Sequence, residues 1–285
     1  MSENKIQGLV GENFDPRINE NDIRIVTFNL ANYIPPEKRV DKFFKLMEMF
    51  DADILMFQEA FSMTPPSEIM KQHNMRFYNW HEYVDETLEK MGYALVPTNH
   101  DEIPSNVHCN PIYYRSSKIE LTDSSLHIFP SSGATFTVAD LKRVSDKKPF
   151  TCICSHFSVD AGERDDDGVV FAEFLTEYQK AHNNAPTFLL GDLNSLKSNL
   201  PAPITEIMTH ALDIPDILTK NVGYGSTCRI AGVWPGNWLR KDECLIDHAL
   251  GVGEGYRGKQ FQIIATEMAA ATSDHIPVLF DFELT

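Results

Sequence analysis

The chain has 285 residues, and its 41 acidic side chains outnumber its 25 Lys and Arg side chains, which leaves a formal net charge of −16. This charge excludes a broad surface that neutralises phosphates, because non-specific nucleic-acid affinity comes mainly from Lys and Arg. A small basic groove, or a divalent cation that offsets phosphate charge, remains compatible with it. The apolar fraction of 42% is ordinary for a globular protein, and the length fits one large domain or two small ones.

The five cysteines predict reduced, structural thiols, because their number is odd and their spacing matches no zinc pattern. Cys152 and Cys154 are expected to share one face of a strand and to pack as small apolar residues. No apolar stretch is long enough to span a bilayer, and the polar start of the chain has no signal-peptide core. We therefore expect a monomeric cytoplasmic protein, with secretion left open if a signal peptide has been removed.

The pattern of apolar residues predicts a flexible tail at 1–22 and a single domain at 23–285. Apolar runs and period-two alternation predict strands, and apolar positions at helical spacing predict helices. Up to residue 130 the predicted elements are strands at 23–30, 52–61 and 92–97, helices at 35–50 and near 66–74 and 82–91, and a strand–turn–strand unit at 110–130. The later elements are two strands within 134–157, helices at 163–184 and near 203–211, a loop-rich segment at 213–243, and strands at 185–195, 243–253, 260–268 and 276–282. Many strands with a few interspersed helices predict an α/β fold with largely antiparallel sheets.

Polar side chains stand at the ends of the buried-looking strands, where a rigid scaffold can bring them together into a cleft. Five strands have such a residue at one end, and a sixth contains an aspartate. These residues are Asn29, Glu59, His156, Asp192 with Asn194, Asp274 with His275, and Asp247. We expect them to converge along one sheet edge. Taken singly, each has a structural explanation, such as a turn for Gly191 to Asn194 or a core position for His156.

The chemistry of these side chains is consistent as a set. Carboxylates and an amide oxygen form a hard, oxygen-rich site that suits Mg²⁺ or Mn²⁺ better than zinc. Histidines and an asparagine amide are hydrogen-bond donors for phosphate oxygens, and an aspartate can orient or deprotonate water. Metal-assisted hydrolysis of a phosphate ester requires these groups together.

The motifs TFNL, FQE, SHF, GDLNS, LIDHAL and TSDHIPV also occur in the order of the endonuclease/exonuclease/phosphatase superfamily, so the chain from about 23 to 282 resembles that superfamily, which has the deoxyribonuclease I-like fold. The resemblance implies a four-layer sandwich in which helices flank two packed, largely antiparallel sheets. It implies a catalytic domain over 23–285 and a phosphate-ester substrate.

The resemblance also implies particular roles for the site residues. Glu59 would be the principal metal ligand, with Asn29 on the metal or its waters. Asp192 would handle the attacking water and Asn194 the phosphate. His156 would bind a non-bridging oxygen, and His275 would contact the phosphate, polarised by Asp247 or by Asp274.

Five further residues are candidates for the substrate side of the cleft. Arg164 stands where several branches of the family have an arginine, although the acids around it fit a solvated surface position equally well. Tyr114 and Arg115 lie in a strand that often carries a Tyr and an Arg facing the cleft. Trp234 and Trp238, in the loop-rich segment, would stack a base, enter a membrane interface, or pin the loop to the body.

The motifs do not identify the ester. The absence of an Arg after Asp247 disfavours the inositol polyphosphate 5-phosphatase branch, and Leu245 and His248 depart from the abasic-site endonuclease pattern. Our first hypothesis is a phosphodiesterase that acts on nucleic acid or a nucleotide by in-line water attack. A phospholipid-directed hydrolase, sphingomyelinase-like or phosphoinositide phosphatase-like, is the alternative, and a catalytically silent binding module is disfavoured.

Overall fold

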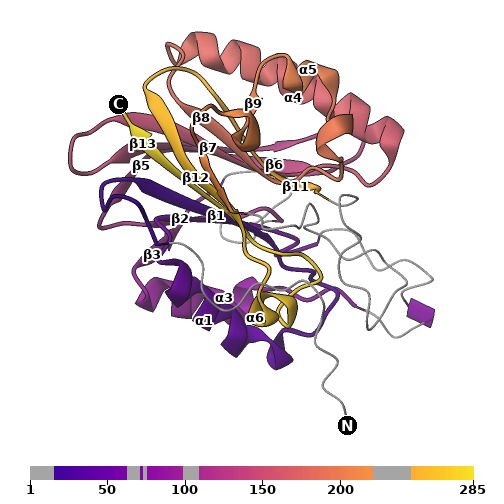
Figure 1. Ribbon diagram of the computed structural model, residues 1–285. Helices are drawn as coiled ribbons and strands as arrows, with labels where there is room; N and C mark the ends of the chain where they lie inside the picture. The colour runs from indigo at the N-terminus through magenta and orange to yellow at the C-terminus, as the bar shows by residue number, and fades with distance from the viewer. Residues whose placement is uncertain (1–15, 63–70, 73–75, 99–108, 221–244) are drawn as a thin grey trace.

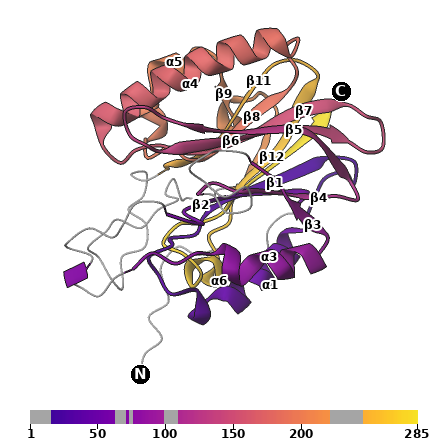
Figure 2. The same cartoon turned by 180° about the vertical axis from the view of Figure 1, so that it is seen from behind.

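The computed structural model describes residues 16–62, 71–72, 76–98, 109–220 and 245–285. Its helices and strands form four layers (Figure 1). Helices α1 (Val40–Phe50), α3 (His81–Lys90) and α6 (Glu267–Ala270) cover one sheet. Helices α4 (Ala161–Ala181) and α5 (Ala202–Thr205) cover the other, as the view from behind also shows (Figure 2). The predicted α/β sandwich is confirmed.

Within the described residues the first sheet has seven strands in the order β10-β12-β13-β1-β2-β4-β3. Its strands are β1 (Ile23–Asn29), β2 (Ile54–Gln58), β3 (Tyr93–Leu95), β4 (Ile112–Arg115), β10 (Leu218–Lys220), β12 (Tyr256–Ile263) and β13 (Val278–Leu284). Strands β1 and β2 pair in parallel, as do β10 and β12, and the other pairs are antiparallel. The strand closest to the end of the chain, β13, therefore lies inside this sheet, between β12 and β1.

The second sheet has six strands in the part of the chain that the structure describes, in the order β5-β6-β7-β8-β11-β9. They are β5 (Ile119–Ile128), β6 (Thr135–Arg143), β7 (Pro149–His156), β8 (Thr187–Asp192), β9 (Thr209–His210) and β11 (Asp247–Val252). Its parallel pair is β7 with β8, and its other pairs are antiparallel. Each sheet thus has a parallel pair near its middle, and both sheets are largely antiparallel, as expected.

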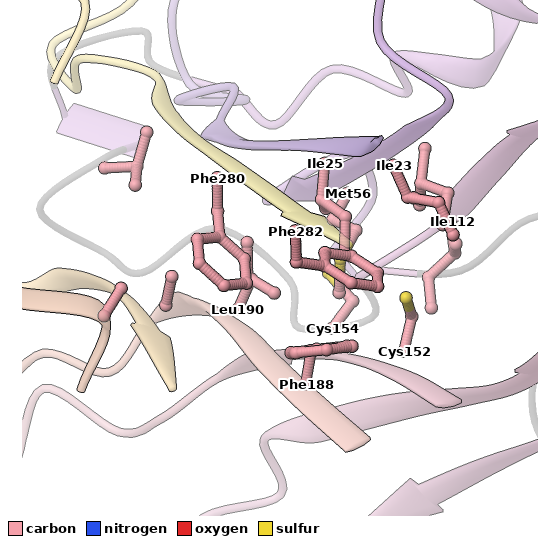
Figure 3. Packing of buried hydrophobic residues seen from close by; sticks show 14 of the residues in the cluster. Ile23, Ile25, Met56, Ile112, Cys152, Cys154, Phe188, Leu190, Phe280 and Phe282 are labelled. Carbon is pink, nitrogen blue, oxygen red and sulfur yellow. The ribbon is translucent and has the colours of Figure 1, made fainter. Parts of the chain in front are cut away.

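The inner faces of the two sheets share a core of apolar side chains. Ile25 and Phe280 from the first sheet meet Phe188 and Leu190 from the second (Figure 3). Cys154 lies in this core together with Cys152, and both thiols are free and fully buried, as predicted. Two further clusters pack the outer face of the first sheet against α1 and α3, and that of the second sheet against α4. These cores hold the strand ends in fixed positions.

Two helices and one strand differ from their predicted bounds. The helix expected at 35–50 is split, because Arg39 adopts the non-helical angles φ −135° and ψ −11° between a 3-10 turn at Pro36–Lys38 and α1. The helix expected near 203–211 is short, since α5 is followed by β9 and by a 3-10 turn at Ala211–Asp213. The strand expected at 260–268 ends at Ile263, because the Thr266 hydroxyl accepts a hydrogen bond from the Ala269 N–H and starts α6.

Most of the predicted tail lies outside the described residues. Within its last part, Arg17 donates to the Asp22 carbonyl at 2.7 Å and forms an ion pair with Asp53, the residue before β2. Helix 66–74 falls mainly in the ranges that are not described. No helix in the described ranges is long and apolar enough to cross a membrane.

Candidate active site

The two sheets bring their polar strand ends together from opposite sides. In the parallel pair β1–β2, Asn29 lies opposite Gln58, next to Glu59. In the parallel pair β7–β8, His156 lies opposite Asp192. Asp247 is also opposite Asp192, because β11 runs antiparallel to β8. The site therefore spans both sheets, and our expectation of a single sheet edge was wrong. Two sheets contribute because the parallel pairs β1–β2 and β7–β8, one from each sheet, have their carboxyl ends at this end of the sandwich.

Asp192 lies at the centre of the contacts between the two sheets. Its Oδ2 accepts a hydrogen bond from the Asn29 side-chain amide at 3.0 Å, and its Oδ1 accepts one from the Asn194 backbone N–H at 2.9 Å. The Nε2 atoms of His156 and His275 each lie 3.6 Å from the same Oδ2. Asp192 is 2% exposed, so these donors and rings define its environment.

Gly191 allows β7 and β8 to approach closely next to the site. A Cβ atom at this position would lie 2.0 Å from the Ser155 carbonyl oxygen, and the residue has φ +150°. A side chain would force the strands apart where His156 and Asp192 are paired. The glycine of the GDLN motif is thus required by the backbone at this point.

Asn29 joins the carboxylates of the two sheets. Its fully buried side-chain amide nitrogen also donates to Glu59 Oε1 at 3.1 Å, while its Oδ1 accepts a hydrogen bond from the Ala31 N–H at 2.9 Å. In this geometry Asn29 presents N–H groups to the carboxylates. Its assignment as a metal ligand stays a prediction.

Three residues in the loops around the site have left-handed backbone conformations without being glycine. Ala31, Glu59 and Asn194 have φ values of 47°, 52° and 48°. Such conformations cost about 1 kcal/mol or more for residues other than glycine and asparagine, and they gather at functional sites. The half-buried Glu59 is therefore aimed by a strained turn that directly follows β2.

His275 is oriented by Asp247. The Nδ1 atom of His275 lies 2.8 Å from Asp247 Oδ2, and since a carboxylate accepts, Nδ1–H is the donor. Its Nε2 then faces Asp192. Both residues are buried, at 5% and 1% exposure. The sequence left Asp247 and Asp274 open as the partner of His275, and the structure places Asp247 on the ring.

Asp274 has a different partner, because it accepts a hydrogen bond from the Tyr33 hydroxyl. Burial and the adjacent Asp274 carboxylate raise the pKa of Tyr33, so the phenol stays protonated and donates. Ser273 connects the same two parts of the chain, since its hydroxyl donates to the Asn29 carbonyl at 2.7 Å. The SDH triplet thus fastens the segment before β13 to the segment after β1.

Asn194 and His156 differ in how accessible they are. The Asn194 side-chain amide donates to the Phe157 carbonyl at 2.8 Å, which ties the loop after β8 to the loop after β7. The His156 side chain is 26% exposed, the largest value among the rings next to Asp192. His156 is therefore open to a bound substrate, and contact between Asn194 and a phosphate stays a prediction.

Asp192, Asp247 and His275 form a buried group that could hold a metal ion, because their ligand atoms all lie within 4.8 Å of one another. Glu59 is close as well, since it shares the Asn29 amide with Asp192. Carboxylates at such separations repel one another when ionised, and a cation relieves that repulsion. The donor set therefore fits a divalent cation, which the fold family generally uses.

His248 does not join the catalytic group, although it follows Asp247 directly. Its Nε2 lies 2.7 Å from the Ser195 carbonyl and its Nδ1 lies 3.0 Å from His210 Nε2. His210 Nδ1 accepts from the Leu212 N–H at 3.1 Å. These partners require both rings to be neutral, and burial lowers the pKa of His248 to about 4 and that of His210 to about 2. The pair supports the loop that carries Asn194.

The predicted substrate-side residues are dispersed. Arg164 is half-buried and donates to the carbonyls of Ser158 and Val159, at 3.3 and 3.1 Å, in the loop after β7. Arg115 donates to Asp51 at 2.9 Å and stacks on Tyr93 at 4.8 Å.

Arg115 and its neighbour Tyr114 lie at the far end of the first sheet, because β4 runs antiparallel to β2 and pairs Tyr114 with Ile54. The structure therefore does not bring these two residues to the Asp192 group. Trp234 and Trp238 lie outside the described residues.

The sequence analysis did not identify two residues that contact the segments of the site. Tyr33 and Arg39 lie in the segment between β1 and α1, and the sequence analysis placed Arg39 inside a predicted helix at 35–50. No signal singled out Arg39, because Glu37, Lys38, Asp41 and Lys42 are charged residues in the same stretch.

The family model described as "Endonuclease/Exonuclease/phosphatase family" matches residues 26–275, so the chain belongs to this family and the resemblance is confirmed. Its members are phosphoesterase hydrolases. A comparison with curated proteins found no match.

Several solved structures share the fold. The chain is similar to an endonuclease/exonuclease/phosphatase from Bacteroides vulgatus, with 20% identity and a TM-score of 0.68 over 93% of this chain and 100% of that one. It is similar to D. rerio TDP2 complexed with a single-strand DNA product, with 12% identity and a TM-score of 0.65 over 93% and 100%. It is also similar to the Bacteroides thetaiotaomicron mannosyl-6-phosphatase Bt3783, with 15% identity and a TM-score of 0.64 over 91% and 99%.

Proposed function

We propose that this protein is a divalent-metal-dependent phosphodiesterase that acts on nucleic acid or a nucleotide by in-line attack of water. One observation carries the proposal. Asp192 is buried at the meeting point of two sheets, within 3.6 Å of His156 and His275, and is held by Asn29. The carboxylate is suited to orient a water molecule, and the two imidazoles beside it are suited to stabilise an anionic transition state.

Mg²⁺ or Mn²⁺ is the proposed cofactor. Glu59 would be its principal ligand, because its carboxylate offers hard oxygen donors beside the Asn29 amide that it shares with Asp192. When bound, the cation neutralises phosphate charge and polarises the phosphoryl oxygens.

Three side chains would then carry out the remaining steps of the reaction. Asp192 would orient the attacking water and accept its proton. His275, fixed by Asp247 through Nδ1, would offer Nε2 to a phosphoryl oxygen. The partly exposed His156 would donate to a non-bridging oxygen. Each of these groups is held by backbone or side-chain contacts before substrate arrives, which is the condition for electrostatic preorganisation.

Two of the similar structures bear on the substrate class. Similarity to TDP2 with its DNA product supports a nucleic-acid or nucleotide ester, and similarity to a mannosyl-6-phosphatase supports a phosphomonoester. A lipid substrate would be expected to need an apolar surface. Exposed large apolar side chains in the described ranges come from separate segments, at Ile18, Val144, Val159, Val169 and Leu218. We therefore keep the phospholipid-directed hydrolase as the alternative.

The test is a panel of esters with Mg²⁺ and with EDTA. Bis-p-nitrophenyl phosphate, p-nitrophenyl phosphate, a single-stranded oligonucleotide and sphingomyelin vesicles should be compared for wild type, Asp192→Asn and His275→Ala. We expect Mg²⁺-dependent hydrolysis of bis-p-nitrophenyl phosphate and of the oligonucleotide, which both substitutions abolish, whereas hydrolysis of sphingomyelin alone favours the phospholipid-directed alternative. Activity undiminished by EDTA contradicts metal dependence, and turnover of the monoester alone contradicts the diesterase assignment.

Asp140→Asn is the matched control. Asp140 also contacts a histidine, His182 at 3.6 Å, and it accepts from the Tyr178 hydroxyl, but it lies on β6 against the end of α4. Its activity should equal that of wild type. We further propose a cytoplasmic monomer, and light scattering on a size-exclusion column tests the monomer.

A further inference from the structure

Arg39 is a buried cation beside the site. It is 3% exposed, and its guanidinium Nη2 donates to the carbonyls of Ala31 at 2.7 Å and Ile34 at 2.6 Å. Its Nη1 donates to the Thr272 carbonyl. The guanidinium carbon also lies 4.6 Å from the centre of the Trp80 ring. One side chain thus contacts three segments that are distant in sequence.

Each contacted segment carries a residue of the site. Ala31 and Ile34 belong to the segment that follows Asn29, and Thr272 precedes the segment that ends in His275. The third segment contains Trp80 and is connected to Glu59. The Trp80 N–H donates to the carbonyl of Ala60, the residue after Glu59, at 2.8 Å. Arg39 is therefore the point at which the loops of Asn29, Glu59 and His275 are joined.

Two further contacts join the same segments. The Tyr33 hydroxyl donates to Asp274, and the Ser273 hydroxyl donates to the Asn29 carbonyl. Both run between the loop after β1 and the loop before β13. A shift of either loop would have to break these bonds together with those of Arg39.

Arg39 stays charged although burial opposes its charge. Burial lowers the pKa of Arg39 to about 10, against the favourable influence of Asp274, Tyr33 and Glu59, so the guanidinium stays charged at neutral pH. Its planar fork can serve carbonyls on two segments at once, whereas a lysine ammonium acts as a single point of charge on a flexible stem.

We propose that Arg39 is a positioning residue for hydrolysis, which holds the loops of Asn29, Glu59 and His275 at the separations that the reaction needs. The inference rests on the proposed function. It assigns no contact between Arg39 and substrate. It makes the guanidinium geometry, and not its charge alone, the requirement, and an error of about 1 Å in such positioning can cost about a hundredfold in rate.

Arg24 is a matched control for the general effect of a buried arginine. It is also 3% exposed, and it also joins the β1 and β13 segments, through bonds to Asp281 of 2.8 and 2.7 Å. It lies near the start of β1, at the opposite end from Asn29. Loss of its fork should weaken the fold without moving the site.

The experiment compares Arg39→Lys, Tyr33→Phe and Arg24→Lys with wild type. kcat and KM are measured on bis-p-nitrophenyl phosphate well below each thermal midpoint, and amide hydrogen exchange is measured without metal or substrate. We expect Arg39→Lys to lower kcat by about tenfold or more, with little change in KM and with faster exchange at 30–34 and 271–275. Tyr33→Phe should shift both in the same direction by less, and Arg24→Lys should lower the thermal midpoint while keeping kcat.

The outcomes separate the two proposals. An inactive wild type overturns the proposed function, and exchange at the two loops still tests the inference. An active wild type with kcat for Arg39→Lys within twofold overturns the inference, as does an equal loss of kcat in Arg24→Lys. If Arg39→Lys does not fold, Tyr33→Phe decides, and unchanged kcat and exchange in that variant overturn the inference.

Discussion

The substitution Asp247→Asn tests the pair that orients His275. In the native geometry the Asp247 carboxylate lies 2.8 Å from His275 Nδ1, with both side chains almost completely buried. Asparagine keeps the volume but removes the charge, so it replaces a charge-assisted hydrogen bond by a neutral one. Hydrogen bonds to charged groups contribute about 1.5–3 kcal/mol. If that amount is lost in the transition state, kcat falls about 10- to 150-fold.

The assay is steady-state hydrolysis of bis-p-nitrophenyl phosphate with saturating Mg²⁺, together with thermal denaturation. KM should change little, because Asp247 contacts the ring of His275 and not the substrate. Asp140→Asn serves as the control for removing a carboxylate from a histidine elsewhere, and its kcat should equal that of wild type. A kcat for Asp247→Asn within about threefold of wild type would refute the assignment of Asp247 to His275.

Three further predictions concern the scaffold of the site. Asn29→Asp puts a third carboxylate between Glu59 and Asp192, so unfolding without Mg²⁺ should become easier by about 1–3 kcal/mol, and added Mg²⁺ should restore more stability than in wild type, as measured by thermal denaturation. Gly191→Ala places a methyl group 2.0 Å from the Ser155 carbonyl oxygen, so urea unfolding should show a loss of about 3 kcal/mol or more, and a loss below 1 kcal/mol would contradict the close approach of the strands. The pKa of His210 is about 2 in the folded protein, against an ordinary value of 6.5. The contribution of neutral His210 to the free energy of unfolding is therefore complete above pH 6.5 and is lost as the pH falls, by about 2 kcal/mol between pH 7 and pH 5. Urea titrations at the two pH values should show this loss in wild type and a smaller one in His210→Gln.

The strands of this protein were largely predictable, because a strand that is buried on both faces has a continuous run of apolar residues in the sequence. The apolar runs that contain Ile54–Gln58 and Thr187–Asp192 each end in a polar residue, and the structure finds strands at both places. The same pattern located Glu59 and Asp192 at strand ends, since a rigid element ends where its apolar side chains end.

The partners within the site were not predictable in the same way. Asp247 and Asp274 are both aspartates, so their chemistry does not show which of them contacts His275. That depends on how β11 and β13 are placed in different sheets. The direction of β4 decides that Arg115 lies beside Asp51 and far from the site. Pairing and direction of strands are set by packing of the whole domain, which no local pattern contains.

The central place of β13 has a consequence for how the protein acquires activity during synthesis. Arg24 and Asp281 face each other across β1 and β13 although 257 residues separate them. Contacts of such long range are formed late and slowly in folding. A nascent chain that ends before Val278 lacks the strand that follows His275, and β1 and β12 have no neighbour between them. The site is therefore complete only after β13 has docked, and under the proposed function the onset of hydrolysis during translation would mark the closing of the first sheet.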